Sequence, residues 1–303
     1  MTNRIQRFIA FLLILCIPIF AIAGCTNNDV ANAANQVTTN ANGTYSIDTK
    51  TTTPEGKLDV YMLDIGQGDA ILLKVGDEYS MIDTGDIEHR ENIVAQLKTM
   101  GVTKLKNIII THPHADHMGG FYAIAKAMPI EHVYDDGIVV DNNMYKTYEK
   151  WIEKNKIQRT TLRSGDVVDF GHGAVFVVYA PWVEPLTDKK GETDLNNNSI
   201  VGKLIFGKFS MLFTGDAEWQ EEKKLIKEQN SRLFARILKV GHHGSRTSSS
   251  EDFLKSIKPE SALISNGMYN KYGHPHDVTL RRLQENNIAI YRTDTMGRIH
   301  IST

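Results

Sequence analysis

Cysteine is almost absent from this chain. Its 303 residues include two, Cys16 and Cys25, and both lie near the N-terminus. Residues 26–303 therefore cannot form a disulfide bond, and a metal site there cannot use thiolate ligands. Such a site has to be built from histidine, aspartate and glutamate, which do not oxidise readily.

An excess of basic residues is also missing. The net charge is -2, and removal of residues 1–24, which contain Arg4 and Arg7 but no acid, leaves 32 basic against 36 acidic side chains. Tight nucleic-acid binding through the protein surface depends on a strong positive charge. The composition therefore argues against a general nucleic-acid-binding surface and leaves room only for a local basic groove.

A long apolar run occurs only at the N-terminus. The basic start "MTNRIQR" precedes "FIAFLLILCIPIFAIAG", which predicts a signal peptide over residues 1–24. The following "IAGC" resembles a bacterial lipobox, and the resemblance implies cleavage before Cys25 and lipid attachment to its thiol. The alternative is an uncleaved anchor helix. Both predict an exported protein, and the first anchors it to the outer face of the cytoplasmic membrane.

The remaining chain divides at Lys57. Residues 25–56 are rich in Asn, Thr and Ala and poor in large apolar side chains, so we expect a lipidated cysteine followed by a flexible tether. Residues 57–303 contain apolar runs and helical patterns without an internal linker, which predicts one domain.

Within this domain the two halves follow the same plan, with strands first and then alternating helices and strands. Two packed sheets with helices outside suit this order, so we expect an α/β fold. We predict strands at 57–66, 69–76, 78–85, 104–111, 174–180, 199–207, 209–215, 233–241, 261–265, 288–293 and 298–302, and helices at 90–101, 119–128, 144–156, 216–230, 248–257 and 276–287.

The stretch "THPHADHMGG" carries the strongest chemical signal. It follows the apolar run "NIII" and places His112 and His114 two positions apart, so both side chains project alike from extended backbone. Asp116 and His117 lie just beyond, where the chain turns toward a helix. Two ligand pairs of this kind suit two neighbouring ions of zinc, manganese or iron. The alternative is a solvated turn after a buried strand.

Several stretches together resemble one known family. They are "LDIGQGDAILL", "MIDTG", "IITHPHADHMGGF", "NNNSIV", "FSMLFTGDAE", "LKVGHHGSRTSSS" and "YGHPH". In this order they resemble the metallo-β-lactamase superfamily, and within it the hydrolase-like domain of the ComEC competence proteins. The resemblance implies a metallo-β-lactamase αββα sandwich with two metal ions at one edge of the sheets.

The same resemblance assigns metal ligands. His112 and His114 match those of the first metal, Asp116 and His117 those of the second, and Asp216 the bridging carboxylate. The alternative for Asp216 is an N-cap of the helix that follows. In "GHHGS" one histidine is expected to bind the second metal, for which we favour His243. Its neighbour, His242, would contact the substrate phosphate or the first metal.

One departure from the superfamily pattern concerns the first metal. A histidine ligand usually lies between the HxHxDH motif and the bridging aspartate, but "NNNS" occupies that place here. His132 and His172 lie in poor contexts to replace it. The first metal is therefore predicted to lack one ligand. Asn198 and Ser199 are predicted to hydrogen-bond the substrate, and an Asx turn is the alternative.

Other polar residues are expected around the metals. Asp83 would orient a ligand or a bound water, and Gln67, with its neighbour Asp69, would lie near the site because the flanking glycines permit close backbone approach. One of His274 and His276 would donate to the leaving group or the phosphate, with a structural turn as the alternative. The predicted catalytic residues are Asp116, His242 and His274. No role is predicted for His89, His132, His172 and His300.

These features predict a metal-dependent hydrolase with two divalent ions, zinc or manganese, roughly 3.5–4 Å apart. Hydroxide from a bound water would attack the phosphorus of a phosphodiester in DNA, a wall polymer or a small molecule. The alternatives are a hydrolase of β-lactam or lactone carbonyl bonds, and a non-catalytic metal-bearing module that captures DNA. Besides the substrate, the membrane is the expected partner, through the lipid anchor, and no obligate protein partner is evident.

Overall fold

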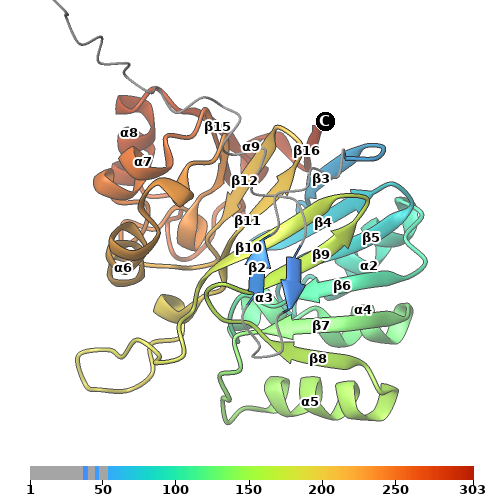
Figure 1. Ribbon diagram of the computed structural model, residues 1–303. Helices are drawn as coiled ribbons and strands as arrows, with labels where there is room; N and C mark the ends of the chain where they lie inside the picture. The colour runs from blue at the N-terminus through green and yellow to red at the C-terminus, as the bar shows by residue number, and fades with distance from the viewer. Residues whose placement is uncertain (1–36, 40–44, 48–53) are drawn as a thin grey trace, which may run out of the picture.

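A computed structural model describes residues 37–39, 45–47 and 54–303 (Figure 1). The predicted signal peptide and Cys25 lie outside the described residues. Within the predicted tether, β1 (Val37–Thr39) pairs antiparallel with β2 (Tyr45–Ile47), a short ladder that the composition did not predict. None of the described helices has the length and apolar character needed to cross a membrane.

The first half of the domain builds a seven-stranded sheet in the order β16-β3-β4-β5-β6-β7-β8. Its first three strands along the chain pair antiparallel, whereas β5 through β8 pair in parallel and are joined by helices. The elements are β3 (Leu58–Met62), β4 (Ala70–Val75), β5 (Glu78–Thr84), α2 (Arg90–Thr99), β6 (Leu105–Ile109), α3 (Ala115–Met118), α4 (Phe121–Ala127), β7 (Ile130–Asp135), α5 (Asn143–Asn155) and β8 (Gln158–Thr161).

The second half repeats this plan in a sheet ordered β15-β14-β13-β12-β11-β10-β9, with β12 through β15 parallel. The last strand, β16, returns to pair with β3 of the first sheet. The elements are β9 (Val167–Gly171), β10 (Ala174–Ala180), η2 (Asn196–Asn198), β11 (Val201–Phe206), β12 (Phe209–Phe213), α6 (Trp219–Gln229), η3 (Asn230–Leu233), β13 (Ile237–Lys239), η4 (Gly241–Gly244), α7 (Glu251–Ile257), β14 (Ser261–Ile264), α8 (Asp277–Glu285), β15 (Ala289–Arg292), α9 (Thr293–Met296) and β16 (Ile299–Ser302).

Strand alternation divides the core into three layers. In β4, Ile71 and Leu73 join the cluster between the two sheets, while Ala70 and Leu72 face α2 and α4 on the outer side. A third cluster lies between the second sheet and α6, α7 and α8. Helices thus cover the outer faces of two packed sheets (Figure 1). This αββα sandwich in a single domain confirms the predicted fold class.

The element predictions differ from the structure at identifiable places. β7, β8 and β9 were not predicted, and β8 shows why: its residues are mostly exposed at the sheet edge, so no apolar pattern marks it. The helix predicted from residue 216 begins at Trp219, with Glu218 at its N-cap position. The serine cap predicted before α7 is present, since Ser250 accepts a hydrogen bond from the Phe253 amide.

The sheets are arranged so that the polar motifs converge. The loops after β3 and β6 of the first sheet lie against loops of the second, since the Ser265 hydroxyl donates to the Gly68 carbonyl and the Ile200 amide to the Thr111 carbonyl. Parallel strands present their carboxyl ends at one sheet edge, where ligand sites commonly form. Side chains from both halves of the chain therefore meet in one place.

Candidate metal centre

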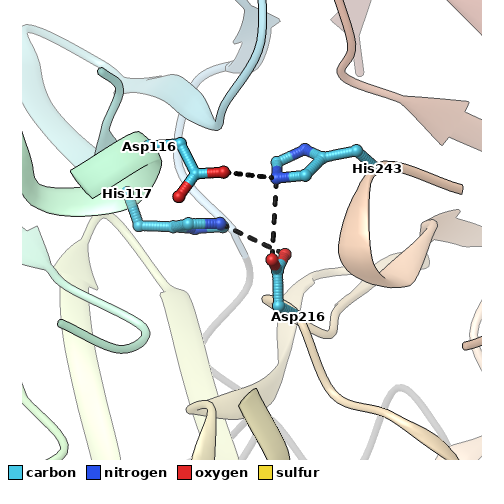
Figure 2. A group of neighbouring side chains, drawn as sticks. All are labelled: Asp116, His117, Asp216 and His243. Atoms are coloured by element: carbon cyan, nitrogen blue, oxygen red, sulfur yellow. Dashed lines mark ion pairs between the residues drawn. The ribbon is translucent and has the colours of Figure 1, made fainter. Parts of the chain in front are cut away.

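Four side chains form the centre of this cluster (Figure 2). Asp116 and His117 come from α3, Asp216 from the loop after β12, and His243 from η4 after β13. One ligand atom from each lies within 4.8 Å of all the others. The His117 Nε2 atom is 3.2 Å from Asp216 Oδ1, and the His243 Nε2 atom is 3.3 Å from Asp116 Oδ2. The arrangement brings together the four predicted ligands of the second metal.

The same four residues fit a divalent metal on two further grounds. His117 Nε2, His243 Nε2 and Asp216 Oδ1 are buried and have no hydrogen-bond partner among the described residues. Bonds of about 2.0–2.1 Å to a tetrahedral ion place two ligand atoms about 3.3 Å apart, close to the two spacings given above. A cation between these atoms would satisfy buried groups that are otherwise costly to leave unpaired.

Electrostatics point the same way. Burial lowers the pKa of His117, but the carboxylates of Asp216 and Asp83 outweigh it and hold that pKa well above its ordinary value. Burial likewise opposes protonation of His243, yet Asp216 and the neighbouring carboxylates raise its pKa to about 10. The facing histidines hold the pKa of Asp216 well below its usual range despite burial. The carboxylates thus attract positive charge, and a metal ion would displace protons on binding.

His112 and His114 lie beside this tetrad, at the turn between β6 and α3. The His112 Nε2 atom is 2.9 Å from His114 Nδ1 and 4.0 Å from Asp216 Oδ2. Burial and the neighbouring His117 hold the pKa of His112 well below its ordinary value, and the same causes lower that of His114. Both rings are therefore neutral, as a metal ligand must be. Asp216 lies between the two groups of predicted ligands.

Asp83 holds Thr111 and the ring of His117 in place. It is the second-last residue of β5 and has a φ of 58°, a left-handed conformation that is uncommon for a non-glycine residue. Its carboxylate accepts hydrogen bonds from the amide and hydroxyl of Thr111, at 2.7 and 2.8 Å, and contacts His117 Nδ1 at 2.8 Å. The contact with Nδ1 leaves Nε2 of His117 directed at Asp216. This position matches the predicted orienting role.

Asp69 and Lys239 form an ion pair behind the cluster. Both side chains are buried, and the Lys239 ammonium also contacts the carbonyl of Gly215 at 3.3 Å. Asp69 lies 3.5 Å from Nδ1 of His243. Its amide donates to the Asp116 carbonyl at 3.0 Å, and a Cβ at Gly68 would clash with that same carbonyl, as the predicted close backbone approach requires. No sequence motif marked Lys239 as part of the site.

The "NNNS" segment divides into two parts. The Asn198 amide is bound by the Leu186 backbone and the Asp194 carbonyl at 2.7–2.8 Å, so it fastens the preceding loop. The hydroxyl of Ser199 instead accepts the Asp216 amide at 3.0 Å and lies 3.4 Å from His112 Nδ1. Ser199 therefore lies at the centre. Asn198 fastens the loop that precedes it, through bonds that are not those of the Asx turn given as its alternative. Asp216 itself does not cap α6, since Glu218 occupies that position.

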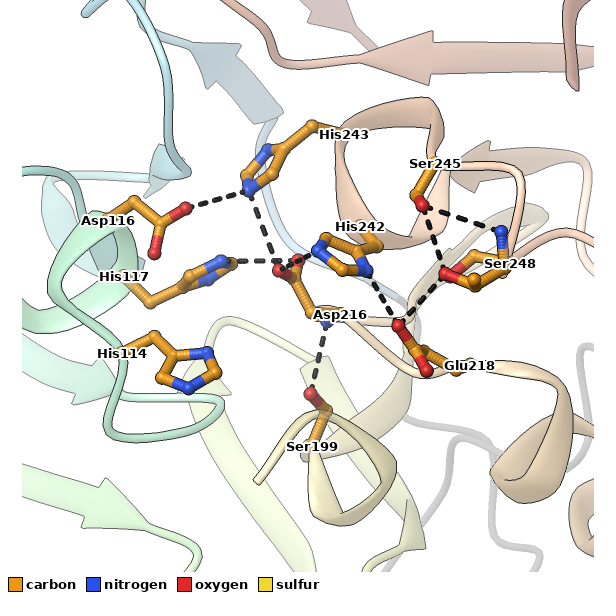
Figure 3. Close-up of polar contacts among 12 residues, drawn as sticks. His114, Asp116, His117, Ser199, Asp216, Glu218, His242, His243, Ser245 and Ser248 are labelled. Carbon is orange, nitrogen blue, oxygen red and sulfur yellow. Dashed lines mark hydrogen bonds and ion pairs between the residues drawn. The ribbon is translucent and has the colours of Figure 1, made fainter. Parts of the chain in front are cut away.

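His242 is turned away from His243 toward a carboxylate that no sequence motif marked as part of the site. Its Nδ1 atom is 3.1 Å from Glu218 Oε1, and its Nε2 atom is 3.6 Å from Asp216 Oδ2 (Figure 3). Glu218 also accepts a hydrogen bond from the Thr247 hydroxyl at 2.9 Å. The only signal for Glu218 in the sequence was its place in "TGDAE", two residues after Asp216.

The loop after β14 brings His274 to the rim of the cluster. Its ring lies 5.4 Å from that of His242, and its Nδ1 atom is buried with no hydrogen-bond partner among the described residues. Burial and the neighbouring histidines lower its pKa to about 4, so it is neutral at pH 7. His276 accepts the Arg246 amide at 3.0 Å, the structural-turn alternative. Gln67 accepts the Gly267 amide at 3.4 Å and lies beside the same loop.

The remaining histidines have contacts elsewhere. His132 bonds Thr160 at 2.8 Å, His172 lies 3.5 Å from Asp77, and His300 is 2.7 Å from Asp59. His89 lies against Gly66. The structure gives these four no contact with the clustered ligands among the interactions described.

A cluster of histidines and aspartates at the edge of an αββα sandwich defines a metallohydrolase fold, and comparison with known proteins agrees. The sequence model described as "Metallo-beta-lactamase superfamily" matches residues 63–267, and the chain belongs to this superfamily. Among curated relatives, the chain is 29% identical to "Competence protein ComA" of Neisseria gonorrhoeae over 81% of its own length, and 30% identical to "ComE operon protein 3" of Bacillus subtilis over 81%. Within the superfamily, the chain is thus similar to one part of these competence proteins.

The chain spans about a third of the length of these relatives, 32% and 33% respectively.

Solved structures support the fold. The metallo-beta-lactamase fold protein YhfI from Bacillus subtilis aligns with a TM-score of 0.56 at 11% identity, covering 81% of this chain and 100% of that one. Zn(2+)-bound PqqB from Methylobacterium extorquens aligns with a TM-score of 0.52 at 11% identity, covering 78% and 87%.

Proposed function

We propose that this chain is a metal-dependent phosphodiesterase that acts on DNA or another phosphodiester. The observation that carries the proposal is the tetrad of Asp116, His117, Asp216 and His243, whose buried ring nitrogens lack hydrogen-bond partners within the described residues. Two-metal sites of this kind suit in-line displacement at phosphorus. Relatives named for competence favour DNA among the phosphodiesters.

Two ions, zinc or manganese, fit the proposed site. Asp116, His117 and His243 would hold one, His112 and His114 the other, and Asp216 would contact both. Ions held there would neutralise phosphate charge and lower the pKa of a bound water toward roughly 7. The histidine and carboxylate donors suit both metals.

The surrounding residues would support this chemistry by position. Asp83 holds the ring of His117, and Ser199 holds the Asp216 backbone, so the ligands are oriented before substrate arrives. His274 is neutral at pH 7 and therefore cannot act there as a strong proton donor. Its N–H group can still donate a hydrogen bond to a phosphate oxygen, which is the role we assign to it.

A substrate panel tests the proposed reaction. Metal-loaded full-length protein is assayed on bis-p-nitrophenyl phosphate, a phosphomonoester, a β-lactam, and single- and double-stranded DNA. We expect phosphodiester cleavage, lost on chelation and in Asp116→Ala, because this carboxylate faces His243 at 3.3 Å. Asp252→Ala, an exposed position in α7, is the matched control and should retain activity. Turnover of the β-lactam alone would contradict the proposal, and bound metal without any turnover would favour a capture module.

We further propose that Cys25 carries a lipid that anchors the protein to the outer face of the cytoplasmic membrane. The motif "IAGC" supports this proposal. Cys25→Ala should release the protein from the membrane fraction or block processing, as measured by fractionation and mass spectrometry of the N-terminus. Cys16→Ala is the matched control and should change neither result, because its thiol would be removed with the signal peptide. Unchanged retention of Cys25→Ala with an intact N-terminus would instead indicate an uncleaved helix.

A further inference from the structure

The first metal position is incomplete as the sequence motifs define it. His112 and His114 offer two nitrogens 2.9 Å apart, and Asp216 offers a shared oxygen. A catalytic zinc site commonly has three protein ligands and one open position for water or substrate. The usual middle histidine is replaced by Ser199, whose hydroxyl is already bonded to the Asp216 amide. A further nitrogen has to come from another part of the fold.

His242 presents such a nitrogen. The carboxylate of Glu218, 3.1 Å from Nδ1, favours the tautomer that carries its hydrogen on Nδ1, and this leaves the lone pair on Nε2 free. That Nε2 faces Asp216 Oδ2 at 3.6 Å, which is too long for a hydrogen bond. It is close to the spacing of about 3.3 Å expected for two ligand atoms on one tetrahedral ion. The pair is therefore spaced for a shared cation.

The backbone explains how adjacent histidines serve different positions. His242 and His243 have φ values of 49° and 53°, so two consecutive non-glycine residues adopt the left-handed conformation. Such residues cost on the order of 1–3 kcal/mol each and persist where the surrounding structure requires them. The turn separates the ring centroids by 6.2 Å at an interplanar angle of 71°. Figure 3 shows His243 directed toward Asp116 while His242 lies between Asp216 and Glu218.

A support chain behind His242 resembles the arrangement found behind metal-bound histidines. Such ligands commonly donate their second ring N–H to a carboxylate, which fixes the ring and increases the basicity of the ligating nitrogen. Glu218 supplies that carboxylate, and the Thr247 hydroxyl holds Glu218 at 2.9 Å. His243 has a different support, the Ser265 carbonyl, 2.9 Å from its Nδ1. Each histidine of the pair thus has its own orienting partner.

We propose that His242 Nε2 is the third nitrogen ligand of the first metal, beside His112 and His114, and that Glu218 positions it. His242 would thereby supply the nitrogen that the missing middle histidine does not. The proposal rests on the dinuclear centre of the proposed function but on no particular substrate. Metal binding, and not turnover, therefore tests it.

The experiment titrates metal-free full-length protein with Co2+ and follows bound metal by equilibrium dialysis and by the visible spectrum of the ion. Wild type should bind two ions. His242→Gln should weaken the first ion selectively, and Glu218→Gln should weaken it by roughly 10–100-fold, the usual effect of removing an orienting carboxylate. His114→Gln and His243→Gln serve as references for loss of the first and second ion. His132 lies in β7 and bonds Thr160 of β8, so His132→Gln should leave both affinities unchanged.

Several outcomes would overturn the proposal. Unchanged first-site affinity in His242→Gln with lost phosphodiester cleavage would make His242 a substrate-contacting residue. Equal loss of both ions in His242→Gln and Glu218→Gln would contradict an effect confined to one site. The proposal would also be excluded if wild type bound a single ion and neither substitution changed the affinity for it. Failure of phosphodiester cleavage on its own would refute the proposed function and leave this assignment intact.

Discussion

Replacement of Asp216 by alanine is expected to remove both metal ions and to reduce hydrolysis at least about 10³-fold. The carboxylate lies 3.2 Å from His117 Nε2, 3.6 Å from His243 Nε2 and 4.0 Å from His112 Nε2, so it faces ligands of both proposed ions. Metal ions contribute several kcal/mol to transition-state stabilisation, and each 1.36 kcal/mol changes the rate tenfold. Metal analysis and turnover on bis-p-nitrophenyl phosphate measure the result.

Asp216→Asn separates the loss of charge from the loss of shape. Its side chain keeps nearly the same volume but provides no negative charge to face the imidazoles. We expect this variant to fold normally but to bind both ions far more weakly than wild type. Wild-type metal content and turnover in Asp216→Ala would contradict the assignment of this residue as the shared ligand.

Replacement of Lys239 by methionine is expected to destabilise the metal-free protein by about 3–5 kcal/mol, because it leaves a buried charge without its partner. Both Lys239 and Asp69 are 1% exposed, and the ammonium also satisfies the Gly215 carbonyl. For a protein of this size each kcal/mol lowers Tm by roughly 2–4 °C. Thermal unfolding in the presence of a chelator measures the change without stabilisation by bound metal.

An exposed ion pair provides the matched control. Lys104 lies 3.0 Å from Glu131, and both side chains are more than half exposed, at 61% and 54%. Lys104→Met should therefore leave Tm almost unchanged, because exposed ion pairs contribute little to stability. In the double variant Asp69→Asn/Lys239→Met, part of the lost stability should return, since the unpaired charge is gone. An effect of Lys239→Met no larger than that of Lys104→Met would show that the buried pair does not hold the loops together.

The parts of the fold that leave a local pattern in the sequence were predictable. In β4 the apolar residues alternate between two layers, and α7 has its serine cap, so periodicity and capping rules apply. β8 has no such pattern, because "QRTT" lies exposed at an edge and is held by pairing with β7. Its conformation depends on a neighbour and not on its own sequence.

The candidate site was predictable where its ligands are adjacent in sequence. The motif around His112 to His117 encodes its own geometry through a strand end and a short helix. The orientations within "GHHGS" are not encoded in this way. Which of His242 and His243 faces the second metal position depends on the left-handed backbone of both residues. It also depends on contacts with Glu218 and Asp116, which come from other loops.

The sequence by itself thus determined the superfamily, the αββα class and the identity of the candidate ligands, because motif spacing and strand alternation are local properties of the chain. Only the tertiary structure decided that Asp216 is no helix cap, that Asn198 fastens a loop, and that Lys239 pairs with Asp69. The last of these contacts joins the loop before β4 of the first sheet to β13 of the second. Their geometry is fixed by sheet packing around a shared core, which no short stretch of sequence specifies.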